Sequence, residues 1–319
     1  MKISAIHIAN LFDYGSYLGT NELQLRQYLD DEELDINNPE NNVSDKEFLS
    51  VFETLSQKVK HTYFGLYYGC YLNIKSLGFI AEISLNASSI EQAIFILQQY
   101  LSTSFSIVEL TTKEYDNSFE IRLDSPIKNE ILKSHLLDTV FCFIYRELKL
   151  MVSDSVLPAL KLPYNDTSEY SSFLNTKVEY EDAYLIQFNK SILTTEINTK
   201  RAKEIEYLLP KFVQMLSLQN AENKVFSVMV RNMILNMCCP EPPNFEQVSK
   251  QFPISDRTFQ RKLSDEGLSF RRIIDDIRKE LSIYLVKGNL IKTKGIAYIL
   301  GYSEPSAYLH AAKRWVNQV

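Results

Sequence analysis

Cysteine is scarce in this sequence, and its positions fit neither a disulfide framework nor a zinc site. Only 4 of the 319 residues are cysteine. Cys70 and Cys142 stand alone, and Cys238 and Cys239 are adjacent, so the paired spacing of zinc ligands is missing. Four reduced thiols are typical of a cytoplasmic protein. We therefore expect neither a metal nor a cofactor.

Long apolar runs are also missing, and so is a leader-like segment at Met1. A helix that crosses a bilayer needs about 20 consecutive apolar residues. A secretory leader has a basic segment followed by an apolar one, and the sequence after Met1 does not show this order. We expect no contact with a membrane and a cytoplasmic location.

The motifs of common catalytic sites are missing as well. His7, His61 and His135 are isolated, without the histidine spacing of a zinc protease or a nearby set of carboxylates. The 9 glycines form no nucleophile elbow, phosphate loop or dinucleotide fingerprint. The acidic pairs at 30–33 lie in a polar stretch, 30–42, that is typical of a solvated surface loop. We therefore expect no catalytic residue and no enzymatic activity.

Net charge changes sign along the chain. Residues 222–319 contain 15 Lys and Arg against 10 Asp and Glu, a net charge of +5. The remaining residues contain 19 basic and 30 acidic side chains, a net charge of −11, so the whole chain carries −6. A basic end on an acidic body indicates a protein that binds nucleic acid through that end. Phosphate repels the acidic body, which confines non-specific attachment to the basic end.

Hydrophobic periodicity predicts an α+β domain in the first two hundred residues. Ser44 and Glu47 form a capping box in front of apolar residues at helical spacing, whereas 77–85 fits either a strand or a buried helix. The β-rich segments 106–112 and 119–123 flank a turn, which predicts a hairpin. The other predicted elements are helices at 88–101, 129–151, 167–174 and 200–218 and strands at 156–162 and near 185–188.

An aromatic cluster lies between the first predicted helices. Its members are Tyr63, Phe64, Tyr67, Tyr68 and Tyr71. These side chains could line a hydrophobic ligand pocket, or they could pack in an ordinary core. The spacing alone leaves both interpretations open.

The remainder of the chain predicts an all-α domain with two helix–turn–helix units joined by a linker helix. A helix at 226–237 comes first and ends before a proline-rich turn at 240–243. The two units run from 245 to 263 and from 296 to 315, and each has a short helix, a tight turn and a second helix with polar and basic residues outward. The linker helix begins at Ser269, ends at Gly288 and has one apolar face. It fixes the distance between the two second helices.

The second helix of the first unit has the composition of a DNA-reading helix. Ser255 is the expected N-cap, and Ile254, Phe259 and Leu263 turn inward. Arginine can pair with guanine and glutamine with adenine in the major groove. A solvated face would also be polar, but within this motif we interpret it as a reading face. Its outward residues are Asp256, Arg257, Thr258, Gln260, Arg261 and Ser264.

The second unit has a similar but less basic helix. Ser303 is the expected N-cap, Pro305 suits the first turn, and Tyr302, Tyr308 and Trp315 turn inward. His310 could contact a base or a phosphate, or merely be solvated. Lys313 and Arg314 are expected to contact the DNA backbone rather than specify a base. The outward residues are Glu304, Ser306, Leu309, His310, Lys313 and Arg314.

This tandem arrangement resembles the AraC/XylS family of bacterial transcription regulators. The residues that carry the resemblance are 255–263, 266–270, Arg278, 296–306 and 313–315, which cover nearly all of 244–316. The resemblance implies that two recognition helices enter successive major grooves on one face of DNA, about one helical turn apart. It implies base-reading positions at Arg257, Gln260 and Arg261 in the first helix and at Ser306 and His310 in the second.

The first two hundred residues resemble the arabinose-binding-like sensor domain of one branch of that family, rather than the cupin barrel of another branch. The resemblance rests on 77–79 followed by the predicted helix at 88–101, and on 178–188 followed by Leu193. It extends over most of residues 10–195. It implies control by an effector whose identity the resemblance leaves open.

Together these observations predict an effector-responsive, sequence-specific DNA-binding regulator that activates transcription. We expect an effector-sensing and dimerisation domain at 1–200, a linker helix region at 201–221 and a double helix–turn–helix DNA-binding domain at 222–319. Expected partners are double-stranded DNA, RNA polymerase, a small-molecule effector and a second copy of the chain. Two alternatives stay open at this stage: a first domain that only dimerises and senses no ligand, and an enzyme domain fused to a DNA-binding module. The expected DNA-binding residues are Ser255, Arg257, Thr258, Gln260, Arg261, Ser303, Ser306, His310, Lys313 and Arg314.

Overall fold

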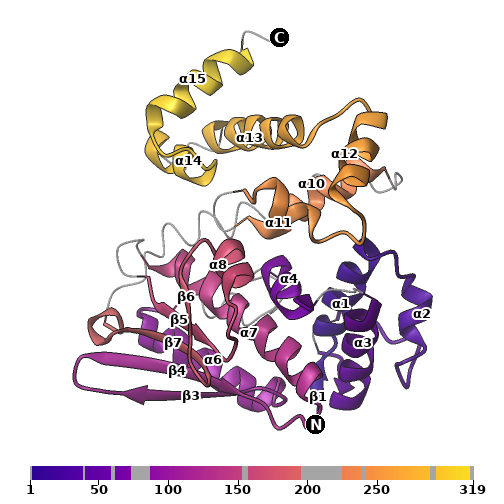
Figure 1. The fold of residues 1–319 in the computed structure, drawn as a ribbon, viewed down its shortest axis with the longest axis vertical. Helices are drawn as coiled ribbons and strands as arrows, with labels where there is room; N and C mark the ends of the chain where they lie inside the picture. Colours follow the sequence, from indigo (N-terminus) through magenta and orange to yellow (C-terminus); the bar gives the residue numbers. More distant parts are fainter. Residues whose placement is uncertain are drawn as a thin grey trace. The chain divides into compact units, whose positions relative to one another are not determined.

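The chain folds into two compact units, Met1–Thr199 (the first unit) and Lys200–Val319 (the second unit) (Figure 1). The computed structural model describes residues 2–38, 40–58, 62–72, 87–152, 157–194, 225–238, 242–287 and 292–316. The first unit is α+β, and the described residues of the second are helical, which confirms the predicted fold class. The predicted segments at 77–85 and 200–218 lie outside the described residues. So does Gly288, the expected end of the linker helix.

The helices of the first unit differ in how many of their residues are buried. Its helices are α1 (Ile6–Tyr17), α2 (Glu22–Arg26), α3 (Asp45–Lys58), α4 (Phe64–Tyr71), α6 (Ile90–Ser104), α7 (Glu130–Met151) and α8 (Ser168–Leu174), with a 3-10 turn at Lys190–Ile192. Every residue of α4 is buried, whereas α3 buries one face and begins at the predicted capping box. Asn129 caps α7, because its side chain accepts hydrogen bonds from the N–H groups of Ile131 and Leu132.

A five-stranded sheet with the order β3-β4-β7-β5-β6 completes the first unit. Its strands are β3 (Glu109–Glu114), β4 (Ser118–Asp124), β5 (Ala159–Leu162), β6 (Val178–Tyr180) and β7 (Tyr184–Asn189). Only β5 and β6 pair in parallel. Phe119 stands opposite Phe188 across the β4–β7 pair, with ring centroids 5.3 Å apart. A separate two-stranded ribbon joins β1 (Lys2–Ser4) to β2 (Asn42–Ser44).

The predicted hairpin, the helices at 129–151 and 167–174 and the strand near 185–188 are confirmed. The helix predicted at 88–101 spans Ile90–Ser104, and the strand predicted at 156–162 begins only at Ala159. The elements β1, β2, β6, α1, α2 and α4 were not predicted. Strands of three residues such as β1 and β6 are too short to show a period in the sequence.

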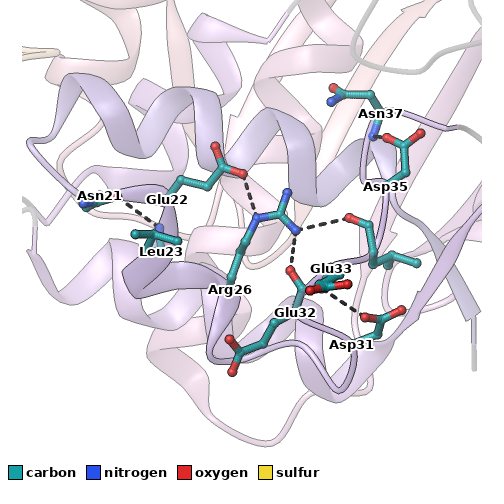
Figure 2. A network of polar contacts seen from close by, with 10 residues as sticks. Asn21, Glu22, Leu23, Arg26, Asp31, Glu32, Glu33, Asp35 and Asn37 are labelled. Carbon is teal, nitrogen blue, oxygen red and sulfur yellow. Dashed lines mark hydrogen bonds and ion pairs between the residues drawn. The ribbon is translucent and has the colours of Figure 1, made fainter.

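The acidic loop at 30–42 is folded onto the end of α2 rather than left open. Figure 2 shows Arg26 at its centre, with its Nε 2.8 Å from Oε1 of Glu22 and its Nη1 donating to the carbonyl oxygens of Glu32 and Leu34. The Asp31 carboxylate accepts a hydrogen bond from the N–H of Glu33, 3.0 Å away. These acidic residues stabilise local turns, which supports their interpretation as loop residues.

Helices α4 and α7 approach each other closely because two glycines of α4 face α7. A Cβ added to Gly65 would lie 2.1 Å from the carbonyl oxygen of His135, and one added to Gly69 would lie 2.6 Å from that of Thr139. The Arg146 guanidinium of α7 donates to the carbonyl oxygens at the end of α4, including that of Leu72 at 2.8 Å. The approach therefore leaves no room for any side chain at these two positions.

A buried carboxyl group of α7 couples folding to pH. Asp138 is 1 % exposed and accepts hydrogen bonds from the hydroxyl groups of Tyr170 (2.8 Å) and Tyr164 (3.1 Å). Burial raises the pKa of this carboxyl to about 7, although the tyrosine hydrogen bonds oppose the shift. The folded protein therefore binds this proton more tightly than the unfolded chain does.

We expect the wild-type protein to lose stability relative to Asp138→Asn as the pH rises from about 4 to about 7. Between about pH 5 and about pH 8 the difference in unfolding free energy should change by about 2–3 kcal/mol, because the amide has no proton to lose. Urea unfolding of both proteins at the two pH values measures this change. A difference that stays constant would show that Asp138 titrates normally in the folded protein.

The second unit consists of α10 (Phe226–Met237), α11 (Phe245–Ser249), α12 (Asp256–Asp265), α13 (Phe270–Lys287), α14 (Thr293–Ile299) and α15 (Pro305–Val316). Helix α10 matches the helix predicted at 226–237, and its apolar residues Val230, Met233 and Ile234 are fully buried. The Glu266 carboxylate accepts the backbone N–H groups of Phe226 (2.8 Å) and Ser227 (2.9 Å), which fixes the start of α10. Among the described residues, none of the helices combines the length and hydropathy needed to cross a bilayer.

Candidate nucleic-acid interface and effector cavity

Helices α11 and α12 form the first helix–turn–helix unit. Asn244 and Gln247 form a capping box at the start of α11, with two reciprocal hydrogen bonds of 2.9 Å. Ser255 caps α12 as predicted, since its Oγ accepts a hydrogen bond from the N–H of Thr258 at 3.3 Å. Phe259 is fully buried and its ring contacts the rings of Phe226, Phe245 and Phe252, with centroids 5.0–5.5 Å apart.

The opposite face of α12 is polar and open. Arg257, Gln260, Arg261 and Ser264 recur at the spacing of one helical face, and all four are exposed. Thr258 is half-buried beside the cap. Because Phe259 and Leu263 anchor the apolar face, this polar stripe is held at a fixed orientation.

The arginines of this stripe have no acidic partner among the residues that the structure describes. Within the part of the second unit that the structure describes, neither Arg257 nor Arg261 forms an ion pair, whereas Lys250 lies 2.8 Å from Glu246 and Arg231 lies 2.6 Å from Glu280. An unpaired guanidinium keeps its full charge and all of its donors available to phosphate or to a base edge.

Helix α13 connects the first helix–turn–helix unit to the second, and Figure 1 shows it between α12 on one side and α14 and α15 on the other. Its 18 residues span about 27 Å. The Arg231–Glu280 ion pair joins it to α10, and the edge-to-face contact of Phe245 with Phe270, at 5.5 Å, joins it to α11. Ser269 caps it as predicted, since its Oγ accepts the N–H of Arg272.

The middle and second half of α13 are joined to the α14–α15 region by polar contacts. Nε of Arg278 donates to the carbonyl oxygen of Leu300 at 2.8 Å, and its guanidinium lies over the ring of Tyr302, 4.9 Å from the centroid. The hydroxyl groups of Ser282 and Tyr308 lie 2.8 Å apart in the interior. These contacts make α13 a rigid connection between the two helix–turn–helix units.

Helix α15 repeats the pattern of α12. Tyr308, Ala311 and Trp315 are buried, as predicted for Tyr308 and Trp315. The exposed side includes Ser306, His310, Lys313 and Arg314, at the spacing of one helical face. Leu309, 49 % exposed, lies beside them.

The predicted N-cap of α15 is wrong by one residue. The helix begins at Pro305, so Glu304 and not Ser303 precedes it. The carbonyl oxygen of Glu304 accepts the N–H groups of Ala307 and Tyr308. Ser303 is exposed in the turn before the helix. Proline at the first helical position set this boundary, because its fixed φ suits that position and it has no N–H to satisfy.

Sequence reasoning left out several exposed basic side chains of the second unit. Among the described residues these are Lys262, Arg271, Arg272, Lys292 and Lys294. They lie outside the exposed polar stripes of α12 and α15, so their position in the helix–turn–helix motif did not identify them. Charge alone could have found them, because phosphate contacts require only an accessible cation.

The first unit encloses a cavity of about 50 Å³ between α1, α3, α4, α6 and α7. One polar pair lies in its wall, since Nε2 of His7 is hydrogen-bonded to the hydroxyl of Tyr100. The aromatic cluster splits between the two interpretations: Tyr68 lines the cavity, whereas the Tyr67 hydroxyl donates to Glu169 at 2.7 Å in the core. The remaining lining residues are Phe48, Phe52, Leu72, Leu97, Leu101, Phe105, Leu136, Thr139, Val140, Phe143 and Ile144.

Comparison with known proteins places the chain in a family. Residues 29–197, more than half of the chain, match the family model described as the arabinose-binding domain of AraC transcription regulators, at their N-terminus. The chain belongs to the AraC transcription regulators. As an AraC-type protein it is a transcription regulator with a helix–turn–helix region, and the resemblance that the sequence indicated is confirmed.

Individual relatives of this AraC-type chain are also regulators. It is 25 % identical over 274 residues to the HTH-type transcriptional regulator VqsM of Pseudomonas aeruginosa, covering 80 % of this chain and 81 % of VqsM. A Mycobacterium tuberculosis HTH-type transcriptional regulator is 33 % identical over 73 residues, 23 % of this chain and 21 % of that protein. The crystal structure of the transcriptional regulator CdpR from Pseudomonas aeruginosa aligns with a TM-score of 0.43 at 16 % identity, over 96 % of this chain and 94 % of CdpR.

Proposed function

We propose that this AraC-type regulator reads DNA through polar stripes on α12 and α15 and that a small-molecule effector bound by its first unit controls this activity. The observation that carries the proposal is a pattern that α12 and α15, the second helices of the two helix–turn–helix units, share. Each of them has a buried apolar face and an exposed polar face on the opposite side. The proposed DNA contacts are Ser255, Arg257, Thr258, Gln260, Arg261, Ser303, Ser306, His310, Lys313 and Arg314.

The proposed contacts divide into two kinds. Arg257, Gln260 and Arg261 lie on the exposed stripe of α12 and carry the donors that recognise guanine and adenine in the major groove. Lys313 and Arg314 lie in the last turn of α15, and we assign them to phosphate. The less basic second helix contributes less to sequence preference.

The remaining parts of the proposal rest on the family. We propose that the protein activates transcription through contact with RNA polymerase, and that it forms a homodimer through the first unit. A regulator of chromosomal genes acts where the chromosome is, which we take to be the cytoplasm. We propose no enzymatic activity, since the similar proteins are regulators.

Replacing Arg261 by alanine tests the assignment of base contacts. A DNA site is first selected from a random-sequence pool with the wild-type protein. We expect Arg261→Ala to bind the selected site about 10- to 100-fold more weakly and a scrambled site nearly as well as wild type, because a bidentate base contact contributes about 1–3 kcal/mol of discrimination. Lys313→Ala should weaken binding to both sites about equally and lower the slope against salt concentration by about 1.

A titration of both sites at several salt concentrations measures these effects. The control is Lys177→Ala, because Lys177 lies in the first unit and is paired with Glu179 at 2.6 Å. This control should bind both sites like wild type. Equal losses on the two sites for Arg261→Ala would show that this arginine does not read bases.

A further inference from the structure

The cavity of the first unit is larger than the voids that folded domains usually contain. Folded domains contain few voids larger than a water molecule, and a volume of about 50 Å³ holds several. Most of its wall is aromatic or aliphatic, and Phe52, Leu136 and Ile144 are each at most 2 % exposed. A well-formed apolar cavity with a small number of polar groups is the usual form of a ligand site.

The polar groups in the wall are few. The Thr139 proton is already used, since it is shared between the carbonyl oxygens of His135 (2.8 Å) and Gly65 (3.2 Å) within the α4–α7 contact. His7 and Tyr100 are hydrogen-bonded to each other at the cavity wall, and Tyr68, which also has a hydroxyl, lines the cavity. The rings of Phe48 and Phe105 flank the imidazole, with the second centroid only 4.8 Å away.

This pair offers either a donor or an acceptor. If Nε2 of His7 accepts the Tyr100 proton, the phenolic oxygen still has a lone pair for a ligand. If Nε2 carries a proton and donates it, the phenolic hydrogen is available instead. Burial lowers the pKa of His7 to about 4, so the imidazole is neutral near neutral pH.

The wall also lacks the partners that a charged or highly hydroxylated ligand needs. None of the described residues that line the cavity is Asp, Glu, Lys or Arg. A buried charge without a counter-ion is strongly disfavoured, and each buried hydroxyl of a sugar requires a hydrogen-bond partner. The His7–Tyr100 pair and the hydroxyls of Tyr68 and Thr139 are too few partners for all the hydroxyl groups of a sugar.

The size of the cavity favours a flexible molecule over a rigid ring. A cavity that accepts an aromatic ring has a volume of about 150 Å³, whereas this one is about a third of that. An unbranched chain of similar volume can adapt its shape by rotation about its single bonds, although the wall must still move to admit it. Leu72, Leu97 and Val140 are only half-buried, so these side chains are the ones that can move to admit it.

We infer that the cavity binds a neutral, short-chain aliphatic molecule with one hydrogen-bonding oxygen, an alcohol or a ketone, whose oxygen bonds to the His7–Tyr100 pair. The inference deepens the proposed function, because this ligand would be the effector. It also predicts that a sugar such as arabinose is a poor ligand for this chain, despite the description of the family.

Four probes with five carbons each test the ligand class on the full-length protein by isothermal titration calorimetry. These are 1-pentanol, 2-pentanone, pentanoate and arabinose. We expect the alcohol and the ketone to bind at least about 10-fold more tightly than pentanoate or arabinose, because only these two bury neither a charge nor several hydroxyl groups. Tighter binding of pentanoate or arabinose, or no binding of any of the four, would overturn the inference.

Two variants and a control locate the site. Tyr100→Phe keeps the ring and removes the hydroxyl, so the alcohol should bind about 3- to 10-fold more weakly. Val140→Phe fills the cavity and should abolish binding. Tyr115→Phe, at the exposed tip of the β3–β4 hairpin, should bind like wild type. Unchanged binding by Val140→Phe would overturn the inference.

Measuring both alcohol binding and DNA binding on the same proteins distinguishes a failure of this inference from a failure of the proposed function. Arg261→Ala should bind the alcohol like wild type while losing its preference for the selected DNA site. If the alcohol binds to wild type but leaves its affinity for DNA unchanged, the cavity is a ligand site and effector control of DNA binding is refuted. If a different molecule changes DNA affinity without competing with the alcohol, the effector site lies elsewhere and the inference fails.

Discussion

Replacing Gly65 by alanine is expected to lower the free energy of unfolding of the first unit by about 3 kcal/mol or more. Helix propensity alone predicts the opposite, because alanine stabilises a helix by roughly 0.5–1 kcal/mol relative to glycine. Packing decides the sign of the change in unfolding free energy at this position. The new Cβ would lie 2.1 Å from the carbonyl oxygen of His135 and 2.7 Å from Cβ of Asp138. The first of these is backbone and cannot rotate away, so α4 has to move away from α7.

Movement of α4 has further costs. It would lengthen the hydrogen bond from Thr139 to the Gly65 carbonyl and the bonds from Arg146 to the carbonyl oxygens at the end of α4. Arg146 is 6 % exposed, and a buried guanidinium that loses its acceptors is strongly destabilising. The cavity should also change, because Tyr68 of α4 is part of its wall.

Thermal or urea unfolding of the full chain, followed by far-ultraviolet circular dichroism, measures the loss. Trp315, the single tryptophan, lies in α15 and its fluorescence reports on the second unit separately. The matched control is Gly19→Ala, where φ is +74° and the added Cβ meets nothing within 4 Å. It should cost only about 1–2 kcal/mol, from backbone strain. A stabilised Gly65→Ala protein would show that α4 and α7 are not in close contact.

Most of the second unit could be predicted from the sequence because its signals are local. Ser255 and Ser269 cap helices, and the apolar spacing around Phe259 and Tyr308 gives the buried face of each reading helix. Exposure of the predicted contacts follows from that spacing. Which of them touch DNA is not a local property, and it stays a prediction.

The first unit was harder to predict because its decisive contacts join distant residues. His7 meets Tyr100 across 93 positions of the sequence, and Asp138 meets Tyr170 across 32. Nothing near Gly65 in the sequence indicates that it packs against α7. The strand order β3-β4-β7-β5-β6 likewise places β7 between strands that precede it in the chain.

The second large expected effect concerns the spacing of the DNA site. Helix α13 is one 18-residue helix: Phe270 at its start contacts Phe245, and Arg278 and Ser282, farther along it, contact Leu300 and Tyr308. A rigid connection of about 27 Å can hold two reading helices in successive major grooves, whose centres lie about 34 Å apart along one face. It cannot lengthen, and it cannot follow a groove to the opposite face of the duplex.

Inserting base pairs between the two halves of the selected site therefore removes one half from reach. About five extra base pairs rotate the second half to the opposite face. About ten restore the face but add about 34 Å, which α13 cannot span. We expect both insertions to weaken binding at least about 100-fold, because only one helix can then read its bases.

The measurement that tests the rigid tandem reader most directly is a mobility-shift titration of the wild-type protein on the selected site, the five-base-pair insertion and the ten-base-pair insertion. The predicted result is tight binding to the selected site and equally weak binding to both insertions. Binding of the ten-base-pair insertion as tight as that of the selected site would show that the two helices are flexibly linked. Tight binding of the five-base-pair insertion would show that only one of them reads DNA.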